Sequence, residues 1–250
     1  MKRVLVVGGT ADSVEFVKKA DPDLFLVVTV FSEQVEKILP QREKMKVRRG
    51  GLDRTGFAAL LEEEGINAVV DLSHPFAVEA SANVKAAAKK QGLPYYRFER
   101  DSFAGTKNRI DYADFEAAAA GLASFPGNIL LTIGSRHLDP FLSEPRLKDR
   151  CYMRVLASSK VLKELEEKEV DPGHIFAMKG VASVALNIAL AREISAAAIV
   201  SKDSGIAGGL PEKAEACEKL GIPLVVVGRP PSEGSAFYDM ESILNEIRSK

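Results

Sequence analysis

Four short segments of the 250-residue chain combine glycine or proline with polar side chains, and each follows a predicted strand. The first is Gly8-Gly9-Thr10, which lies between a strand at residues 4–7 and a helix expected from Asp12. A glycine turn at such a point lets backbone N–H groups and a helix N-terminus approach an anion, usually a phosphate. The full Gly-x-Gly-x-x-Gly fingerprint is absent, so a plain connecting turn is the alternative.

The second segment, residues 71–77, follows a predicted strand at residues 68–70. Ligands of open parallel sheets bind outside the carboxyl ends of the strands, so polar residues are well placed here. Asp71 or Ser73 could instead cap the next helix. Four polar or rigid residues among seven exceed what a cap requires, so we predict functional roles for Asp71, Ser73 and His74.

Two strands in the second half of the chain end in segments that carry a cation. The strand at residues 129–132 leads to Arg136, which could hold a phosphate or carboxylate through two parallel hydrogen bonds. The strand at residues 198–200 leads to Lys202-Asp203-Ser204-Gly205, where a lysine could bind an anion or act as an acid once its pKa is lowered. The alternatives are a solvated arginine and a glycine-rich loop without a role.

Apolar runs alternate with longer amphipathic segments along the chain. The predicted strands are uninterrupted apolar runs, typical of parallel strands covered on both faces: residues 4–7, 24–30, 68–70, 129–132, 198–200 and 224–227. The predicted helices have apolar residues three and four apart: residues 57–64, 77–91 and 181–194. This alternation predicts an α/β fold of two Rossmann-like, doubly wound domains with mainly parallel sheets.

Polar, glycine-containing stretches predict a domain boundary near residues 103–127. We expect an N-terminal domain at residues 1–103, which contains the Gly-Gly-Thr turn. The C-terminal domain is expected at residues 104–250 and contains the Lys-Asp-Ser-Gly loop. Residues 139–150 are expected to be a polar connection within it. A cleft between the two domains would admit a large ligand.

The composition argues against several classes of function. The chain has 34 basic and 35 acidic side chains and a net charge of −1, which disfavours a general nucleic-acid binder. No apolar run approaches the length of a membrane-spanning helix. Two distant cysteines and three scattered histidines predict neither a disulfide framework nor a metal site, and we expect a cytoplasmic location.

Taken together, these segments resemble the precorrin-6A reductase family of corrin-ring biosynthesis. The matching residues run along nearly the whole chain: Gly8-Gly9-Thr10, residues 71–77, Ser81, Asn83, residues 92–100 and 131–136, Leu138, Phe141, Asn187, residues 202–205, Gly208-Gly209, Lys213 and Arg229-Pro230. Residues 49–53 and 95–100 look more like the cobalt-containing, anaerobic branch. The family usually places a glutamate and an arginine after Gly-Gly-Thr, whereas this chain has Asp12 and Val14, so a contact made by that arginine is missing or supplied elsewhere.

The resemblance implies reduction of a ring double bond in precorrin-6A, or its cobalt form, to precorrin-6B by NADPH or NADH. It implies cofactor binding by Gly8, Gly9, Thr10, Ser32, Asp71 and Ser73 in the first half of the chain. It implies binding of the anionic tetrapyrrole by Arg136, Asp203, Ser204, Gly205 and Arg229 in the second. The candidate catalytic residues are Lys202, which would serve the macrocycle, and His74, which would orient substrate or cofactor.

The residues that follow the second predicted strand do not distinguish between NADH and NADPH. Glu33 could accept a hydrogen bond from a ribose hydroxyl, whereas Ser32 could serve a phosphate. We also expect the protein to make transient contacts with other enzymes of the corrin pathway.

Two other functions fit the same fold class, because a fold does not determine a function. One is a nucleotide-using enzyme such as a methyltransferase. The other is a non-catalytic protein that carries a corrinoid intermediate between pathway enzymes. The polar segments at strand ends favour catalysis.

Overall fold

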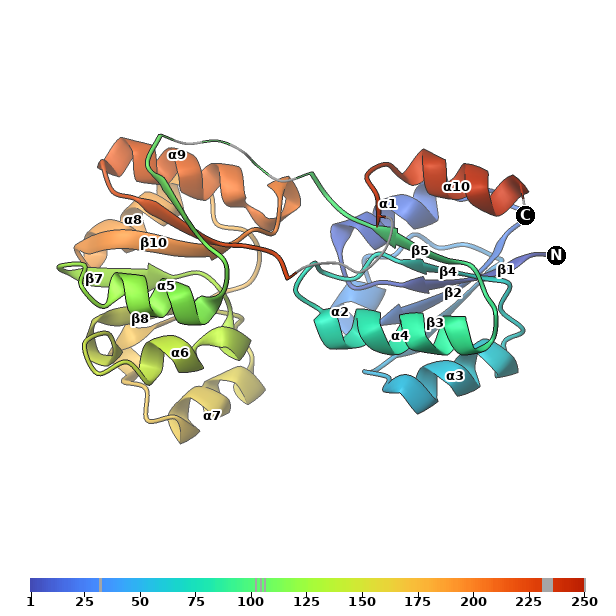
Figure 1. The fold of residues 1–250 in the computed structure, drawn as a ribbon, viewed down its shortest axis with the longest axis horizontal. Coiled ribbons are helices and arrows are strands. Elements are labelled where there is room, and N and C mark those ends of the chain that lie inside the picture. Colours follow the sequence, from blue (N-terminus) through green and yellow to red (C-terminus); the bar gives the residue numbers. More distant parts are fainter. Residues whose placement is uncertain (32, 102, 104, 106, 231–235, 250) are drawn as a thin grey trace. The chain divides into compact units, whose positions relative to one another are not determined.

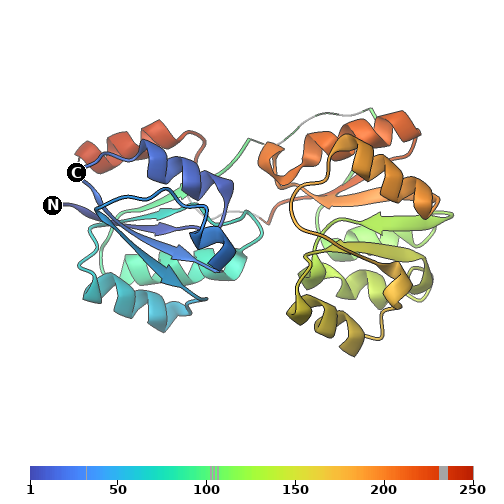
Figure 2. The ribbon, with the colours of Figure 1, turned by 180° about the vertical axis from the view of Figure 1, so that it is seen from behind.

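The computed structural model describes residues 1–250 apart from 32, 102, 104, 106, 231–235 and 250. The chain forms two compact units, shown in Figures 1 and 2. Unit 1 comprises residues 1–100 and 230–250, and unit 2 comprises residues 101–229. The first crossing between the units therefore lies close to the end predicted for the N-terminal domain, residue 103.

Within its described residues, unit 1 is built around a parallel sheet of six strands. The strand order across the sheet is β12 (Ala236–Phe237), β5 (Tyr95–Phe98), β4 (Ala68–Asp71), β1 (Arg3–Val7), β2 (Phe25–Val30) and β3 (Met45–Arg49). This is the order of a Rossmann sheet, in which the direction of chain progress reverses between β1 and β4. Ligands bind at the carboxyl ends of the strands at such a reversal.

Helices cover both faces of this sheet (Figures 1 and 2): α1 (Ala11–Lys19) and α10 (Met240–Ser249) pack on one face, α3 (Arg54–Glu63) and α4 (Val78–Lys90) on the other. A single turn, α2 (Glu33–Glu36), follows β2. In β1, Val4 and Val6 face α1 while Leu5 and Val7 face α3 and α4, because successive strand residues point to opposite faces. Both faces are buried, which explains the uninterrupted apolar run.

The chain's last segment completes unit 1, which corrects the expected assignment of residues 230–250 to the second domain. Strand β12 pairs in parallel with β5, and the next helix, α10, buries Ile243, Leu244 and Ile247 in the core that Phe16 of α1 also enters. The physical reason is that α10 has a strongly apolar stripe, and this stripe is buried on the open face of the first sheet.

Unit 2 also contains a parallel sheet of six strands among its described residues. The strand order is β6 (Arg109–Tyr112), β11 (Leu224–Val227), β10 (Ala196–Lys202), β7 (Asn128–Leu131), β8 (Cys151–Val155) and β9 (Ile175–Ala177). Five strands repeat the order seen in unit 1, with β7 in the place of β1 and β10 in the place of β4. The sixth strand comes from the start of unit 2 here and from the end of the chain in unit 1.

The helices of unit 2 cover both faces of its sheet: α5 (Phe115–Leu122), α6 (Asp139–Leu142) and α7 (Ser159–Glu167) on one, α8 (Val184–Glu193) and α9 (Leu210–Leu220) on the other. Residues 139–150, expected as a polar connection, instead contain α6 and bury Phe141 and Leu147 completely. The helix α6 has four residues, which is too short for a helical pattern of apolar residues to be recognised in the sequence.

No described helix has the length and apolar character needed to cross a membrane. The two cysteines, Cys151 and Cys217, are buried and unbonded to each other. Burial raises the pKa of both thiols to about 12, so they are protonated components of the core at neutral pH.

Candidate active site

The turn between β1 and α1 depends on two glycines for different reasons. A Cβ atom on Gly8 would lie 3.0 Å from the Thr29 carbonyl oxygen and 3.1 Å from the Ser13 side chain, so a larger residue does not fit. Gly9 has a φ of +112°, which L side chains rarely adopt, and no described heavy atom lies within 4 Å of where its Cβ would be. The backbone at Gly9 therefore borders open space at the strand reversal of unit 1.

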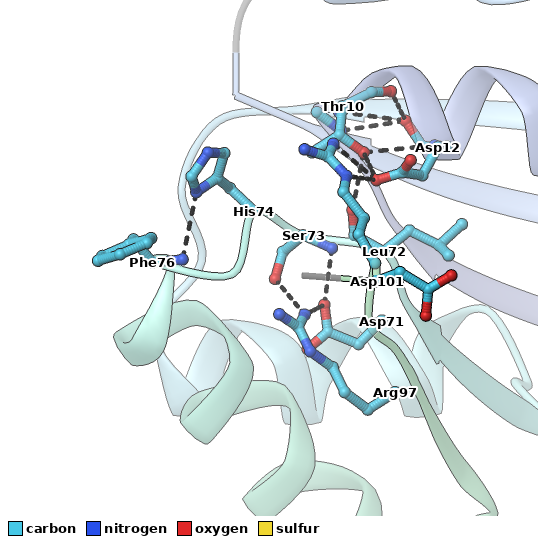
Figure 3. A network of polar contacts seen from close by, with 12 residues as sticks. Thr10, Asp12, Asp71, Leu72, Ser73, His74, Phe76, Arg97 and Asp101 are labelled. Carbon is cyan, nitrogen blue, oxygen red and sulfur yellow. Dashed lines mark hydrogen bonds and ion pairs between the residues drawn. The ribbon is translucent and has the colours of Figure 1, made fainter. Parts of the chain in front are cut away.

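Thr10 caps α1 and joins this turn to the end of β4 (Figure 3). Its hydroxyl oxygen accepts from the Ser13 N–H at 3.4 Å, and Ser13 Oγ accepts in turn from the Gly9 N–H at 3.2 Å. The Thr10 hydroxyl donates to the Leu72 carbonyl oxygen at 2.9 Å. The structure thus brings the first two sequence segments together at the carboxyl edge of one sheet.

Asp12 and Arg100 form an ion pair at the start of α1. Both Nε and Nη2 of Arg100 lie 2.7 Å from Asp12 Oδ2. Arg100 comes from the end of β5, so it brings a cation to the region where the family pattern has an arginine and this chain has Val14. Among the described residues, no acceptor is present for the N–H groups of Ala11 and Asp12. Free N–H groups in a first helical turn suit an anionic ligand.

Asp71 is completely buried at the end of β4 and binds three donors (Figure 3). The donors are the Ser73 N–H at 2.9 Å, the Tyr95 hydroxyl at 2.7 Å and the Arg97 guanidinium at 2.9 Å. Arg97 also donates to Ser73 Oγ at 2.9 Å. Burial and the Asp71 carboxylate raise the pKa of Tyr95, so its phenol stays protonated. Asp71 and Ser73 are bound to other side chains, which favours a role in shaping the β4–α4 turn over direct contact with a cofactor.

His74 follows this buried cluster, and its ring points away from the Asp71 side chain in Figure 3. Its Nδ1 accepts a hydrogen bond from the Phe76 N–H at 3.2 Å. An imidazole that accepts at Nδ1 is neutral and carries its proton on Nε2. His74 is partly exposed, so Nε2 can serve as a donor toward a ligand.

The end of β2 gives less information about the cofactor. Ser32, predicted to contact it, lies outside the described residues. The Glu33 carboxylate forms exposed ion pairs with Lys37 at 2.8 Å and with Arg49 at 3.8 Å. Arg49 Nε lies 2.7 Å from a carboxylate oxygen of Glu36. The end of β2 thus carries acidic groups, which suit the ribose hydroxyls of NADH, and basic groups, which suit the extra phosphate of NADPH. It favours neither nicotinamide dinucleotide.

In unit 2, Lys202 ends β10 beside β7, where the strand order of that sheet reverses. Burial lowers the pKa of its ammonium from 10.5 to about 8, with a smaller effect from the charge of Arg136. The structure therefore brings the third and fourth sequence segments together. An ammonium with this pKa is mostly protonated at neutral pH and releases its proton more readily than an ordinary lysine.

His137 belongs to the same cluster, and the sequence analysis missed it. Its ring stacks on Phe115 of α5 with a centroid distance of 4.3 Å and an interplanar angle of 7°. Burial lowers the pKa of His137, and the charges of Lys202 and Arg136 lower it further. The imidazole is therefore neutral at pH 7, and it interacts electrostatically with Lys202. The position of His137 directly after Arg136 is the feature of the sequence that could have identified it as a site residue.

Arg229 and Asp203 bind each other. Arg229 Nε donates to the Asp203 carbonyl oxygen at 2.9 Å, and Nη2 lies 3.3 Å from Asp203 Oδ1. Nη2 also donates to the Asp101 carbonyl oxygen at 3.2 Å. Asp203 is 7% exposed. These contacts favour a positioning role for both residues, which fix the backbone next to Lys202, over the substrate contacts predicted for them.

The loop after Lys202 is compact and has little space for larger residues. The Ser204 N–H donates to the Lys202 carbonyl oxygen at 2.7 Å, and Gly205 has a φ of +68°. A Cβ atom on Gly208 would lie 1.8 Å from Ser204 Oγ. Buried Lys213 donates to the carbonyl oxygens of Gly208 and Gly209 at 2.9 and 3.0 Å. The loop is thus held by Arg229 at one end and by Lys213 at the other.

Comparison with known proteins places these features in one family. The family model described as Precorrin-6x reductase CbiJ/CobK matches residues 3–248. A cobalt-precorrin-6A reductase from Priestia megaterium is 32% identical over 257 aligned residues, covering 98% of this chain and 100% of the relative. The cobalt-precorrin-6A reductase of Methanothermobacter thermautotrophicus is also 32% identical, covering 98% of this chain and 84% of the relative.

A solved structure named CobK precorrin-6A reductase has the same fold. It superposes with a TM-score of 0.77 at 25% identity, and the match covers 100% of this chain and 97% of that one. Because a family model, full-length relatives and a full-length structural match agree, the predicted resemblance and the predicted α/β architecture are confirmed. The chain belongs to the precorrin-6x reductase family of oxidoreductases.

Proposed function

We propose that the protein reduces a carbon–carbon double bond in the macrocycle of cobalt-precorrin-6A, or of precorrin-6A; its relatives are named as reductases of these two compounds. The observation that carries the proposal is the partly buried lysine Lys202, whose pKa is about 8, at the strand reversal of unit 2. Reduction of a ring double bond needs a proton as well as a hydride. Lys202 can supply that proton near neutral pH.

The residues of unit 1 fit a nicotinamide dinucleotide. The open space at Gly9 admits a phosphate close to the backbone, and the N–H groups of Ala11 and Asp12 can donate to it. The ion pair of Arg100 with Asp12 fixes the end of β5 against the same helix start. The bound cofactor would supply the hydride. Thr10 and the buried pair Asp71–Arg97 keep the turns around this site in place.

The residues of unit 2 fit the polyanionic tetrapyrrole. Arg136 is exposed and can pair with a carboxylate, and its charge also keeps the pKa of Lys202 low. Lys202 holds a proton on Nζ and donates it to a ring carbon or pairs with a carboxylate. The imidazole of His137 is neutral at pH 7 and so adds no further positive charge beside Lys202. Ser204 and Gly205 shape the loop that carries the ammonium group.

His74 completes the set as an orienting residue of unit 1. Its Nδ1 is occupied by the Phe76 N–H, and the proton on Nε2 can hold a ligand oxygen. Pro75 limits the backbone freedom of the segment, so the ring is presented in a narrow range of positions. We assign proton delivery to Lys202, whose pKa is tuned by its surroundings.

The cobalt-containing substrate is the form we favour, because the relatives described above carry that name. The choice between NADPH and NADH stays open in this proposal. We also propose that the protein is located in the cytoplasm.

The decisive assay follows nicotinamide oxidation with four combinations: precorrin-6A or its cobalt form, each with NADPH or NADH. We expect turnover, and formation of the corresponding precorrin-6B, with at least one combination. Methyl transfer from a methyl donor without nicotinamide oxidation would instead identify the methyltransferase alternative. Tight tetrapyrrole binding without turnover in all four combinations would identify a carrier.

A further inference from the structure

Arg154 is a cation of unit 2 that the roles assigned above leave unexplained. It lies on β8, two residues after Tyr152, so its side chain points to the face of the sheet covered by α8 and α9. The side chain is partly buried, and burial lowers the pKa of the guanidinium. Among the described residues it forms no ion pair, and its hydrogen bond is the one from Nη1 to Asn187 Oδ1 at 2.9 Å.

Asn187 fixes the direction of this arginine. Asn187 is completely buried in the first turns of α8, and its Nδ2 donates to the carbonyl oxygens of Ala182 and Ser183, both at 3.0 Å. Because both amide protons are used, Oδ1 must face Arg154. One guanidinium nitrogen is therefore held by the protein, while the other donors of Arg154 lack an acceptor among the described residues.

A second basic side chain, Lys213, interacts electrostatically with Arg154. Lys213 is 2% exposed and has two backbone carbonyls as partners but forms no ion pair with a described residue. Burial lowers the pKa of Lys213 to about 7, and the charges of Arg154 and Lys202 add to the effect, while Glu212 and Cys217 act against it. The charges of Arg154 and Lys202 thus both act on Lys213, and no carboxylate of a described residue forms an ion pair with Arg154 or Lys213. An anion bound beside Arg154 would offset this repulsion.

We propose that Arg154, aimed by Asn187, binds an anionic group at the carboxyl edge of unit 2, and that this group is a peripheral carboxylate of the macrocycle. The inference rests on the proposed function and extends it to a second carboxylate site besides Lys202 and Arg136. A phosphate of the dinucleotide has the same chemistry. We favour the carboxylate because unit 1 already provides donors for phosphate at the start of α1.

The test measures binding separately from turnover. Precorrin-6A, or its cobalt form, is titrated by absorbance into the protein without nicotinamide, and each dinucleotide is titrated separately. Arg154→Met removes the charge, and Arg154→Lys keeps it but cannot form two parallel hydrogen bonds. The matched control is Arg192→Met, which removes the same charge from the exposed, opposite end of α8.

We expect Arg154→Met to raise the tetrapyrrole Kd at least about tenfold, Arg154→Lys to raise it severalfold, and Arg192→Met to leave it unchanged. The salt dependence of tetrapyrrole binding should become weaker in Arg154→Met alone. Dinucleotide affinity should be unchanged in all three. If Arg154→Met fails to fold, Arg154→Lys and its Kd decide the question.

Normal tetrapyrrole binding by a folded Arg154→Met protein with lowered stability would show that the arginine only braces α8, and would overturn the proposal. Weakened dinucleotide binding with normal tetrapyrrole binding would assign the site to a phosphate and overturn it as well. Turnover by the wild-type protein is measured separately, as the test of the proposed function. Absence of wild-type turnover contradicts the proposed function, whereas turnover with unaltered binding by both Arg154 variants contradicts the second carboxylate site alone.

Discussion

At the scale of single residues, the environment of Lys202 determines what its ammonium can do. The side chain is partly withdrawn from water, which disfavours the charged form, and Arg136 adds repulsion. The same lysine on an exposed loop would have an ordinary pKa and contribute little on removal. The position at the end of β10 therefore gives a common side chain the lowered pKa that the proposed proton donor needs near neutral pH.

Replacement of Lys202 by Met keeps most of the aliphatic stem and removes the charge. We expect kcat/KM for the tetrapyrrole to fall at least about tenfold, or roughly 1.4 kcal/mol of transition-state stabilisation, because proton donation and carboxylate pairing are both lost. Cofactor Kd should barely change. Steady-state kinetics and dinucleotide titration measure the two effects, and a variant with normal tetrapyrrole kinetics but weak dinucleotide binding would reverse the assignment of the two units.

The pH dependence of the reaction should report the same group. Because Lys202 must be protonated to act and its pKa is about 8, kcat/KM should fall as the pH rises through about 8. The fall should disappear in Lys202→Met, whose residual activity lacks the titrating ammonium. Profiles of kcat/KM from pH 6 to about 10 for both proteins provide the comparison; an identical alkaline fall in the variant would mean that another group titrates.

Gly9 offers a test of the dinucleotide turn. A Cβ atom at this position has no described heavy atom within 4 Å, but Val must adopt a φ of +112°, so some stability is lost. Gly65→Val is the control, because Gly65 also has open space around its Cβ position and a positive φ, of +59°. We expect both variants to lose stability, Gly9→Val more, while only Gly9→Val raises the dinucleotide Kd, by at least about tenfold. Equal dinucleotide affinity in two folded variants would remove this turn from the cofactor site.

At the scale of elements, the carboxyl ends of β4 and β5 are joined by buried polar contacts. Asp71, Tyr95 and Arg97 come from neighbouring strands, and their mutual hydrogen bonds define where the β4–α4 turn begins. The cluster lies beside Thr10, which reaches the Leu72 carbonyl oxygen. A rigid edge of this kind positions His74 and the Gly8-Gly9 turn with respect to each other.

Asp71→Asn should destabilise unit 1 by about 3–5 kcal/mol, because it leaves the Arg97 guanidinium buried without its counter-charge. Denaturant unfolding measures this change. The control is Glu215→Gln, which breaks an exposed pair with Lys219 and should cost less than about 1 kcal/mol. An Asp71→Asn protein as stable as the wild type would show that the hydroxyl groups of Ser73 and Ser81, which accept from Arg97 at 2.9 and 3.3 Å, satisfy the guanidinium without the carboxylate.

At the scale of the whole molecule, each unit obtains its sixth strand from a different place in the chain. Unit 1 receives β12 from the C-terminal segment, and unit 2 receives β6 from the segment just after the first crossing. The five remaining strands have the same order in both units. The chain therefore crosses between the units twice, near residues 100 and 230.

Leu244→Ala tests this arrangement. Leu244 of α10 is completely buried in the core of unit 1, so its truncation should cost about 2–5 kcal/mol. Hydrogen exchange should then accelerate in β2 but not in β10. Leu165→Ala, equally buried in unit 2, should give the reverse pattern. Acceleration in β10 alone after Leu244→Ala would contradict the assignment of the C-terminal helix to unit 1.

Hydrophobic patterning alone predicted the parallel α/β class, because a strand buried on both faces must be apolar at every position. The central strands β1, β2, β4, β7, β10 and β11 were found for this reason. The edge strands escaped notice, and so did the interior strands β5 and β8, whose burial is interrupted by partly exposed residues. Strand β3 (MKVRR) and strand β12, two residues long, have little apolar signal because one side of each borders solvent or loop. Pattern recognition fails where burial is partial.

The polar segments at strand ends were also visible in the sequence, since glycine turns with charged residues directly after apolar runs are uncommon without a purpose. What the sequence could not determine is which polar side chains bind each other. Asp71 with Arg97, Asp203 with Arg229 and Asp12 with Arg100 are separated by 26, 26 and 88 residues. Strand order brings them together, and only pairing in space decides whether a charge is used within the protein or remains available to a ligand.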